Sequence, residues 1–129
     1  MTNQRVVLST AGSQDQARRI AEGLLVRRLA ACVNIIPRVT SIFRWKDDRI
    51  QEDEEWILLI KTTEQAFDQV RAALKELHPY EVPECIALPI DAGNKEFLDW
   101  IEKSVNLTGK SGDSPENSGS AAESKGPRP

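Results

Sequence analysis

The stretch from His78 to Glu84 holds the residue types best suited to chemistry in this chain. Its seven residues, His-Pro-Tyr-Glu-Val-Pro-Glu, include the only histidine and the only tyrosine of the sequence, together with two carboxylates. Pro79 and Pro83 each fix their own φ and push the preceding residue out of the α region, so we expect an extended, stiff loop. Such a loop can hold side chains in fixed directions, which makes it the first candidate for a binding site.

Within this loop, His78 is the leading candidate for a metal ligand. Neutral imidazole is a common ligand, and Glu81 or Glu84 could add an oxygen atom. The alternative is structural, because a histidine in the last turn of a helix can interact with the free carbonyl groups and the helix dipole. Stable transition-metal sites generally use three or four protein ligands. We therefore expect any metal binding here to be weak and to be shared between subunits.

Composition limits the classes of function that fit. The chain has 129 residues and a formal net charge of -3, and the charges beyond residue 105 cancel. A mildly acidic domain over residues 1–105 argues against nucleic-acid binding. Residues 106–129 are rich in Gly, Ser and Pro, which predicts a disordered tail. No membrane span or secretory signal is visible, so we expect a cytoplasmic protein whose Cys32 and Cys85 stay reduced as small core side chains.

The hydrophobic periodicity predicts alternating strands and helices along the chain. The expected order is strand, helix, strand, strand, helix, strand and helix, over residues 5–10, 13–31, 32–45, 50–62, 62–78, 85–90 and 94–105. Ser13 with Gln16, and Thr62 with Gln65, stand at the spacing of a helix capping box. Pro37 cannot donate a ladder hydrogen bond, which predicts a bulge, a bend or an edge position in the second strand.

This order of elements predicts an α+β fold of the ferredoxin-like type. Two β-α-β units flank a long central hairpin, which gives an antiparallel sheet with helices on one face. Residues 56–60 are apolar at every position, which indicates a strand buried on both sides. One chain of this size supplies helices for only one face of the sheet. We therefore expect an oligomer in which the sheets of neighbouring subunits pack or pair.

Several motifs, in order along residues 5–105, resemble the CutA family of divalent-cation tolerance proteins. They are Leu29-Ala30-Ala31-Cys32-Val33-Asn34, Ser41-Ile42-Phe43-Arg44-Trp45, Ile60-Lys61-Thr62, the seven-residue loop from His78, and Leu88-Pro89-Ile90. The resemblance implies a ferredoxin-like sandwich (βαββαβ plus a C-terminal helix), assembled as a homotrimer by strands joined between subunits. It also implies no established enzymatic activity, a role in tolerance of copper and other divalent metals and, in animal members, the anchoring of a membrane enzyme.

Family members with a proposed copper site place a cysteine in the first strand and a second histidine next to the one before Pro-Tyr. Here these positions hold Ser9 and Leu77, so only His78 of that set is present. The candidate metal ligands that follow are His78, Glu84 and Cys32. A homotrimer would also create clefts between subunits, where we expect Trp45, Lys61, Tyr80 and Glu81 to converge.

Each of these cleft residues has a structural alternative. Lys61 could hold an anion beside the start of a helix, or it could extend from the strand end toward water. The Trp45 side chain could line a ligand cleft or anchor a subunit contact. The acidic run from Glu52 to Glu55 could collect cations, but without a fixed ligand spacing it is more typical of a solvated face.

The sequence therefore predicts a non-catalytic homotrimer that acts in tolerance or response to divalent metal ions, with copper or another divalent metal as the one cofactor implied. Its expected partner is a further copy of itself. We expect no nucleic-acid partner and no membrane span. The alternative prediction is a signalling trimer of the PII type that binds a small anionic ligand between subunits. An enzyme is the weakest candidate, because a single histidine restricts general acid-base chemistry.

Overall fold

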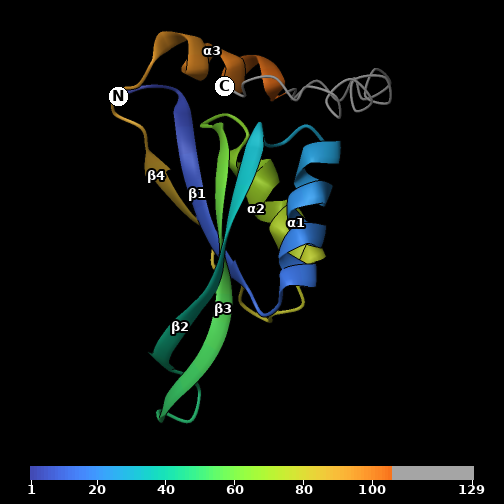
Figure 1. Cartoon of the computed structure of the whole chain (residues 1–129), viewed down its shortest axis with the longest axis vertical. Coiled ribbons are helices and arrows are strands. Elements are labelled where there is room, and N and C mark those ends of the chain that lie inside the picture. Colours follow the sequence, from blue (N-terminus) through green and yellow to red (C-terminus); the bar gives the residue numbers. More distant parts are fainter. Residues whose placement is uncertain (106–129) are drawn as a thin grey trace.

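The computed structural model describes residues 1–105 as a four-stranded antiparallel sheet with three helices (Figure 1). The elements are β1 (Gln4–Ala11), α1 (Gln14–Val26), β2 (Cys32–Arg44), β3 (Ile50–Thr63), α2 (Phe67–Leu77), β4 (Ile86–Pro89) and α3 (Lys95–Ser104). The strand order is β2-β3-β1-β4, with all neighbours antiparallel. The predicted element order and the ferredoxin-like α+β fold are confirmed, while the predicted tail lies outside the described residues.

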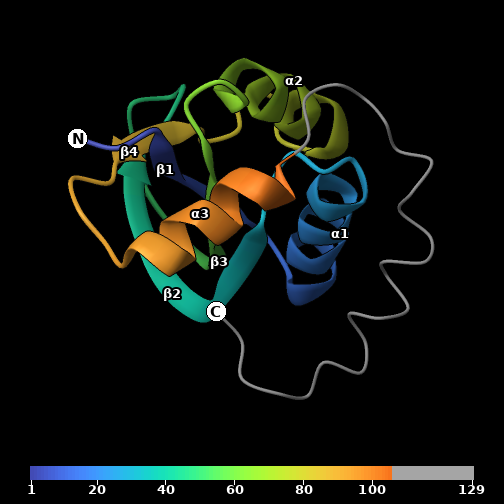
Figure 2. The same cartoon turned by 90° about the horizontal axis from the view of Figure 1, so that it is seen from above.

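Helices α1 and α2 cover one face of the sheet, which can be followed in both views (Figures 1 and 2). The main core forms between them and the strand residues that point toward them, among which Val7, Leu58 and Ile60 are fully buried. The two helices approach closely at Gly23, where a Cβ atom would lie 2.9 Å from the Leu77 side chain. One chain alone therefore covers this face, which we call the helix-covered face.

Helix α1 begins as predicted but ends earlier. The Ser13 side chain accepts a hydrogen bond from the backbone N–H of Gln16, as an N-cap should. The helix then ends at Val26, although the sequence predicts it to continue to Ala31. Arg28 has a φ of 57°, a left-handed conformation that turns the chain out of the helix and toward β2.

The predicted capping box at the start of the second helix is wrong. The Thr62 hydroxyl is buried and donates to the carbonyl of Leu29 at 2.6 Å, so it is not available to cap a helix. The Thr63 hydroxyl instead accepts a hydrogen bond from the N–H of Ala66 in a short turn. Helix α2 therefore begins at Phe67, after this turn.

Strands β2 and β3 form a hairpin that extends well beyond the rest of the sheet (Figure 1). Strand β1 pairs with β3 only from Trp56 to Thr63. Residues 50–55 of β3 therefore pair with β2 alone within the described chain. The predicted irregularity near Pro37 is confirmed as a register shift between Ile36 and Val39, where β2 carries one extra residue. We call the part of the hairpin beyond this shift the overhang.

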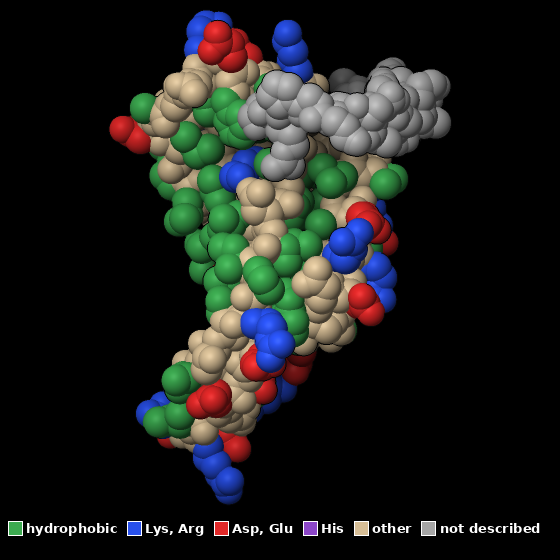
Figure 3. Space-filling view, viewed as in Figure 1, with side chains coloured by type: hydrophobic (Ala, Val, Ile, Leu, Met, Phe, Trp, Pro, Cys, Tyr) green, Lys and Arg blue, Asp and Glu red, His purple; other side chains and the backbone are tan. Residues whose placement is uncertain are grey.

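The second face of the sheet carries apolar side chains without a layer of helices over its middle. We call it the open face and define it by seven residues that oppose one another in the strand register: Val6, Leu8, Ile36, Ile57, Leu59, Ile86 and Leu88. Hydrophobic side chains gather on the side of β1 and β4, above the overhang (Figure 3). Helix α3 packs only at the far end, where the Gln4 side chain donates to the Leu98 carbonyl and to Glu102.

Candidate functional site

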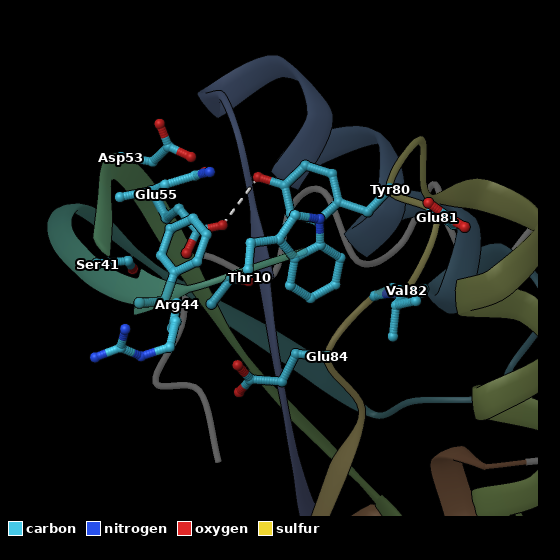
Figure 4. Close-up of a pocket in the computed structure, with 13 residues that line it drawn as sticks. Thr10, Ser41, Arg44, Asp53, Glu55, Tyr80, Glu81, Val82 and Glu84 are labelled. Carbon is cyan, nitrogen blue, oxygen red and sulfur yellow. Dashed lines mark hydrogen bonds between the residues drawn. The ribbon is translucent and has the colours of Figure 1, made fainter. Parts of the chain in front are cut away.

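A pocket of about 650 Å³ lies where the overhang meets the loop that joins α2 to β4 (Figure 4). We call it the hairpin pocket. Thr10 contributes from β1, and residues 80–84 contribute from the loop. The hairpin contributes seven residues: Ser41, Phe43, Arg44, Trp45, Gln51, Asp53 and Glu55. Most of these hairpin residues share one face because alternate strand residues point the same way.

His78 fixes the loop that forms one wall of the pocket. It follows the last residue of α2 and is buried, with 6% of its surface exposed. Its Nδ1 accepts a hydrogen bond from the N–H of Tyr80 at 3.1 Å, so the ring proton is on Nε2, which donates to the carbonyl of Thr10 at 2.6 Å. Nε2 thus connects the ring to β1, and Nδ1 connects it to the loop. The centroids of the His78 and Tyr80 rings are 4.4 Å apart.

Tyr80 reaches from the loop to the hairpin. Its hydroxyl donates to a carboxylate oxygen of Glu55 at 2.9 Å (Figure 4). Burial, followed by this hydrogen bond and the nearby charges of Glu55 and Asp53, raises the pKa of Tyr80 to about 12. A Cβ atom at Gly12 would lie 3.1 Å from the same hydroxyl, so the absence of a side chain there leaves room for the contact.

The lining of the pocket is predominantly acidic. Four carboxylates line it, those of Asp53, Glu55, Glu81 and Glu84, against the single guanidinium of Arg44. Burial, and then the charge of Glu55, raises the pKa of the Glu84 carboxyl. This electrostatic character favours a positively charged occupant and disfavours the small anionic ligand of the alternative prediction.

The two cations nearest the pocket are already engaged. The Arg44 guanidinium donates to the Asp48 carbonyl at 2.8 Å at the tip of the hairpin. The Lys46 ammonium pairs with Glu81 at 2.7 Å. Within the described residues, Asp53, Glu55 and Glu84 form no ion pair with a lysine, arginine or histidine.

The structure brings together some of the predicted site residues and separates others. Trp45, Tyr80, Glu81 and Glu84 all line the hairpin pocket. Two further residues, Lys61 and Cys32, lie opposite each other in the register at the other end of the sheet, with the Lys61 amine 3.9 Å from the Cys32 sulfur and hydrogen-bonded to Asn34. His78 stands behind the pocket wall with its ring nitrogens engaged, so one chain does not assemble the predicted metal ligands into one cluster.

Sequence reasoning missed two carboxylates and one aromatic ring of the pocket. Asp53 and Glu55 belong to the acidic run that was interpreted as a solvated face, and Phe43 was not singled out. The signal was the alternation itself, because residues 53 and 55 share a face of β3 while Glu52 and Glu54 point to the other. No group of three or more His, Cys, Asp or Glu side chains in residues 1–105 is arranged to hold a metal ion.

The two cysteines are free and half-buried, not fully buried in the core. Burial raises the pKa of the Cys85 thiol, which keeps it protonated and weakly nucleophilic at neutral pH. Among the described helices, none is both long and apolar enough to cross a membrane.

Fold and pocket together define a ferredoxin-like α+β domain with an acidic, aromatic-lined pocket under a long hairpin. The model of the CutA1 divalent ion tolerance protein family matches residues 5–104. The divalent-cation tolerance protein CutA of Thermus thermophilus is 52% identical over 102 residues, which cover 79% of this chain and 98% of that protein. The chain belongs to the CutA1 divalent ion tolerance family.

Solved structures agree with this assignment. The structure of CutA from Xylella fastidiosa aligns with a TM-score of 0.79 at 34% identity and covers 81% of this chain and all of that one (100%). A protein from Archaeoglobus fulgidus, described as a periplasmic divalent cation tolerance protein, aligns with a TM-score of 0.76 at 42% identity and covers 80% of this chain and 99% of that one.

Proposed function

We propose that this protein acts in the tolerance of or response to divalent metal ions as a homotrimer without catalytic activity. The family and the names of its relatives, divalent-cation tolerance proteins, support the metal-related role. The open face carries the proposal of assembly. Its apolar side chains lie on the middle of the sheet. They require a cover that the described part of one chain does not supply.

The energetics favour covering this face with further copies of the chain. Ile36, Ile86 and Leu88 are exposed by more than a third of their surface. Burying apolar surface stabilises by about 25 cal/mol for each Å². The overhang adds an unpaired edge of β3 that can pair with a strand of a neighbour. A head-to-tail contact of this kind closes into a ring, and three copies would cover every open face.

The contacts of His78 support the absence of catalysis. Its ring is bound to a backbone carbonyl and a backbone N–H, so it is not positioned to activate a hydroxyl or a thiol. The protonated state of Cys85 points the same way.

Direct copper binding is the second part of the proposal. Glu84 lines the hairpin pocket and offers an oxygen ligand, whereas His78 must give up a hydrogen bond to coordinate a metal. Cys32 lies at the other end of the sheet and can contribute only from a neighbouring subunit. We therefore propose a weak site that draws ligands from more than one chain.

Sedimentation equilibrium and copper titration test the two parts separately. We expect a particle of three chains at micromolar concentration, and a stable single-chain particle would contradict the assembly. For copper, we expect lower affinity in His78→Ala and Glu84→Gln than in the wild type. Equal affinities in all three proteins would remove both ligands from the proposal. Circular dichroism of His78→Ala is the control for folding, because the His78 ring holds the loop in place.

A further inference from the structure

We propose that the hairpin pocket binds a small organic cation, namely a protonated primary amine carried on an apolar body. This binding activity is separate from the proposed response to metal ions and is assigned from the lining of the pocket alone. Three features carry it: the charge of the lining, its aromatic side chains and its size.

The charge of the lining selects for a cation with hydrogen-bond donors. Asp53, Glu55 and Glu84 point acceptor oxygens toward the pocket from two sides, Asp53 and Glu55 from β3 and Glu84 from the loop (Figure 4). None of the three is neutralised by an ion pair within the described residues. An ammonium group has three N–H donors and forms its strongest hydrogen bonds with carboxylates.

The aromatic side chains select for an apolar body next to that ammonium group. Phe43 and Trp45 contribute from the hairpin, and Tyr80 contributes from the loop. The faces of aromatic rings attract cations and also provide apolar contact area. Trp45 has 45% of its surface exposed in one chain, so a ligand can bury indole surface that this chain leaves uncovered.

The size of the pocket separates an organic cation from a bare metal ion. Its volume of about 650 Å³ falls within the range of about 300–1,000 Å³ that is typical of small-molecule sites. A metal ion needs several ligands that converge within a few ångströms, and no such group of three occurs within residues 1–105. The raised pKa of Glu84 agrees with a half-buried carboxylate that lacks a counter-cation.

Three probes of nearly the same size test the role of charge. They are 2-phenylethylammonium, the neutral 2-phenylethanol and the anionic 3-phenylpropionate, each titrated calorimetrically into the full-length protein at neutral pH. We expect saturable binding of the ammonium compound, with the alcohol at least about tenfold weaker because it forms no charge-assisted hydrogen bonds. Binding of the anion should not be detected. Equal binding of alcohol and ammonium, or binding of none of the three, would overturn the proposal.

Two substitutions in the lining locate the binding site. Glu84→Gln should weaken binding of 2-phenylethylammonium by about tenfold, and Trp45→Leu by about threefold, since these changes remove a charged acceptor and a cation–π partner. Glu52→Gln is the matched control, because it removes the same charge from the face of β3 that points away from the pocket. A loss in Glu52→Gln as large as that in Glu84→Gln would indicate nonspecific attraction and would refute the site.

The outcome is distinguishable from that of the metal proposal. Sedimentation of each variant shows whether the assembly is retained, so lost affinity cannot be confused with lost association. A protein that forms trimers and binds copper but ignores the ammonium probe would disprove the organic-cation site and leave the proposed function standing.

Discussion

The two faces of the sheet differ in how completely one chain can cover them. On the helix-covered face, Leu58 and Ile60 are fully buried, whereas on the open face Ile86 keeps 51% of its surface exposed. The same strands supply both faces, because alternate residues point to opposite sides. The difference is therefore one of cover and not of hydrophobicity. We therefore expect the helix-covered face to set the stability of the subunit, and the open face to set the proposed association.

The largest expected effect lies on the helix-covered face. Leu74 of α2 is fully buried against the main core, so Leu74→Ala should lower the free energy of unfolding by about 3 kcal/mol through lost burial and a residual cavity. Denaturant unfolding measures this change. A loss below about 0.5 kcal/mol, the size of a surface substitution, would show that this face is not the stabilising core.

A substitution on the open face should change the association of subunits more than the stability of the single subunit. Ile86→Glu places a charge where a neighbouring subunit should pack, and should weaken association by about a hundredfold in sedimentation velocity experiments. Val26→Glu is the control, because Val26 is equally apolar and 68% exposed but lies on α1. Similar dissociation in both variants, or in neither, would break the contrast between the faces.

The hydrogen bond between Tyr80 and Glu55 can be measured directly, since the chain has one tyrosine. Ultraviolet titration should give a pKa of about 12 for Tyr80 in the wild type, and a lower value in Glu55→Gln, where burial still raises the pKa but the charge of Glu55 is gone. Because the folded-state pKa is raised, this contribution to stability is fully present below pH 10 and is lost as the pH rises through about 12. An unchanged value in Glu55→Gln would mean that burial alone accounts for the shift.

The smallest expected effect concerns Glu84. Its pKa is raised in the folded state, so its charging costs stability as the pH rises above the ordinary carboxyl value of 4.5. Glu84→Gln should therefore be more stable than the wild type at pH 7, and this advantage should disappear in acid below that value. Denaturant unfolding at both pH values tests this, with Glu52→Gln as the control. A constant difference across the range would contradict the raised pKa.

Much of the fold could be predicted from local sequence signals. The order of elements follows from periodicity, the start of α1 from Ser13, and the bulge from Pro37, because each of these signals acts within a few residues. The errors came from distant contacts. Thr62 looks like a helix cap in sequence, but its hydroxyl is bound to Leu29, which is 33 residues away.

The candidate site could be predicted only in part for the same reason. The stiff loop predicts Tyr80, Glu81 and Glu84 as candidate site residues, and all three line the hairpin pocket. Their partners on β3, Asp53 and Glu55, reach them through a tertiary contact between the overhang and the loop, and no local pattern encodes that contact. The distance of Lys61 and Cys32 from the pocket likewise depends on the strand register and not on residue type.

The bulge in β2 changes the phase of the whole overhang. Before the bulge, the even-numbered residues of β2 up to Ile36 point to the side of the open face. After the bulge, the odd-numbered residues from Val39 onward point to that side. The one extra residue thus turns the Phe43 ring into the pocket and leaves Ile42 on the reverse side. Deleting Arg38, whose φ of 60° lies within this bulge, would restore strict alternation and keep the Phe43 ring on the pocket side, because each residue after the bulge would retain its partner on β3.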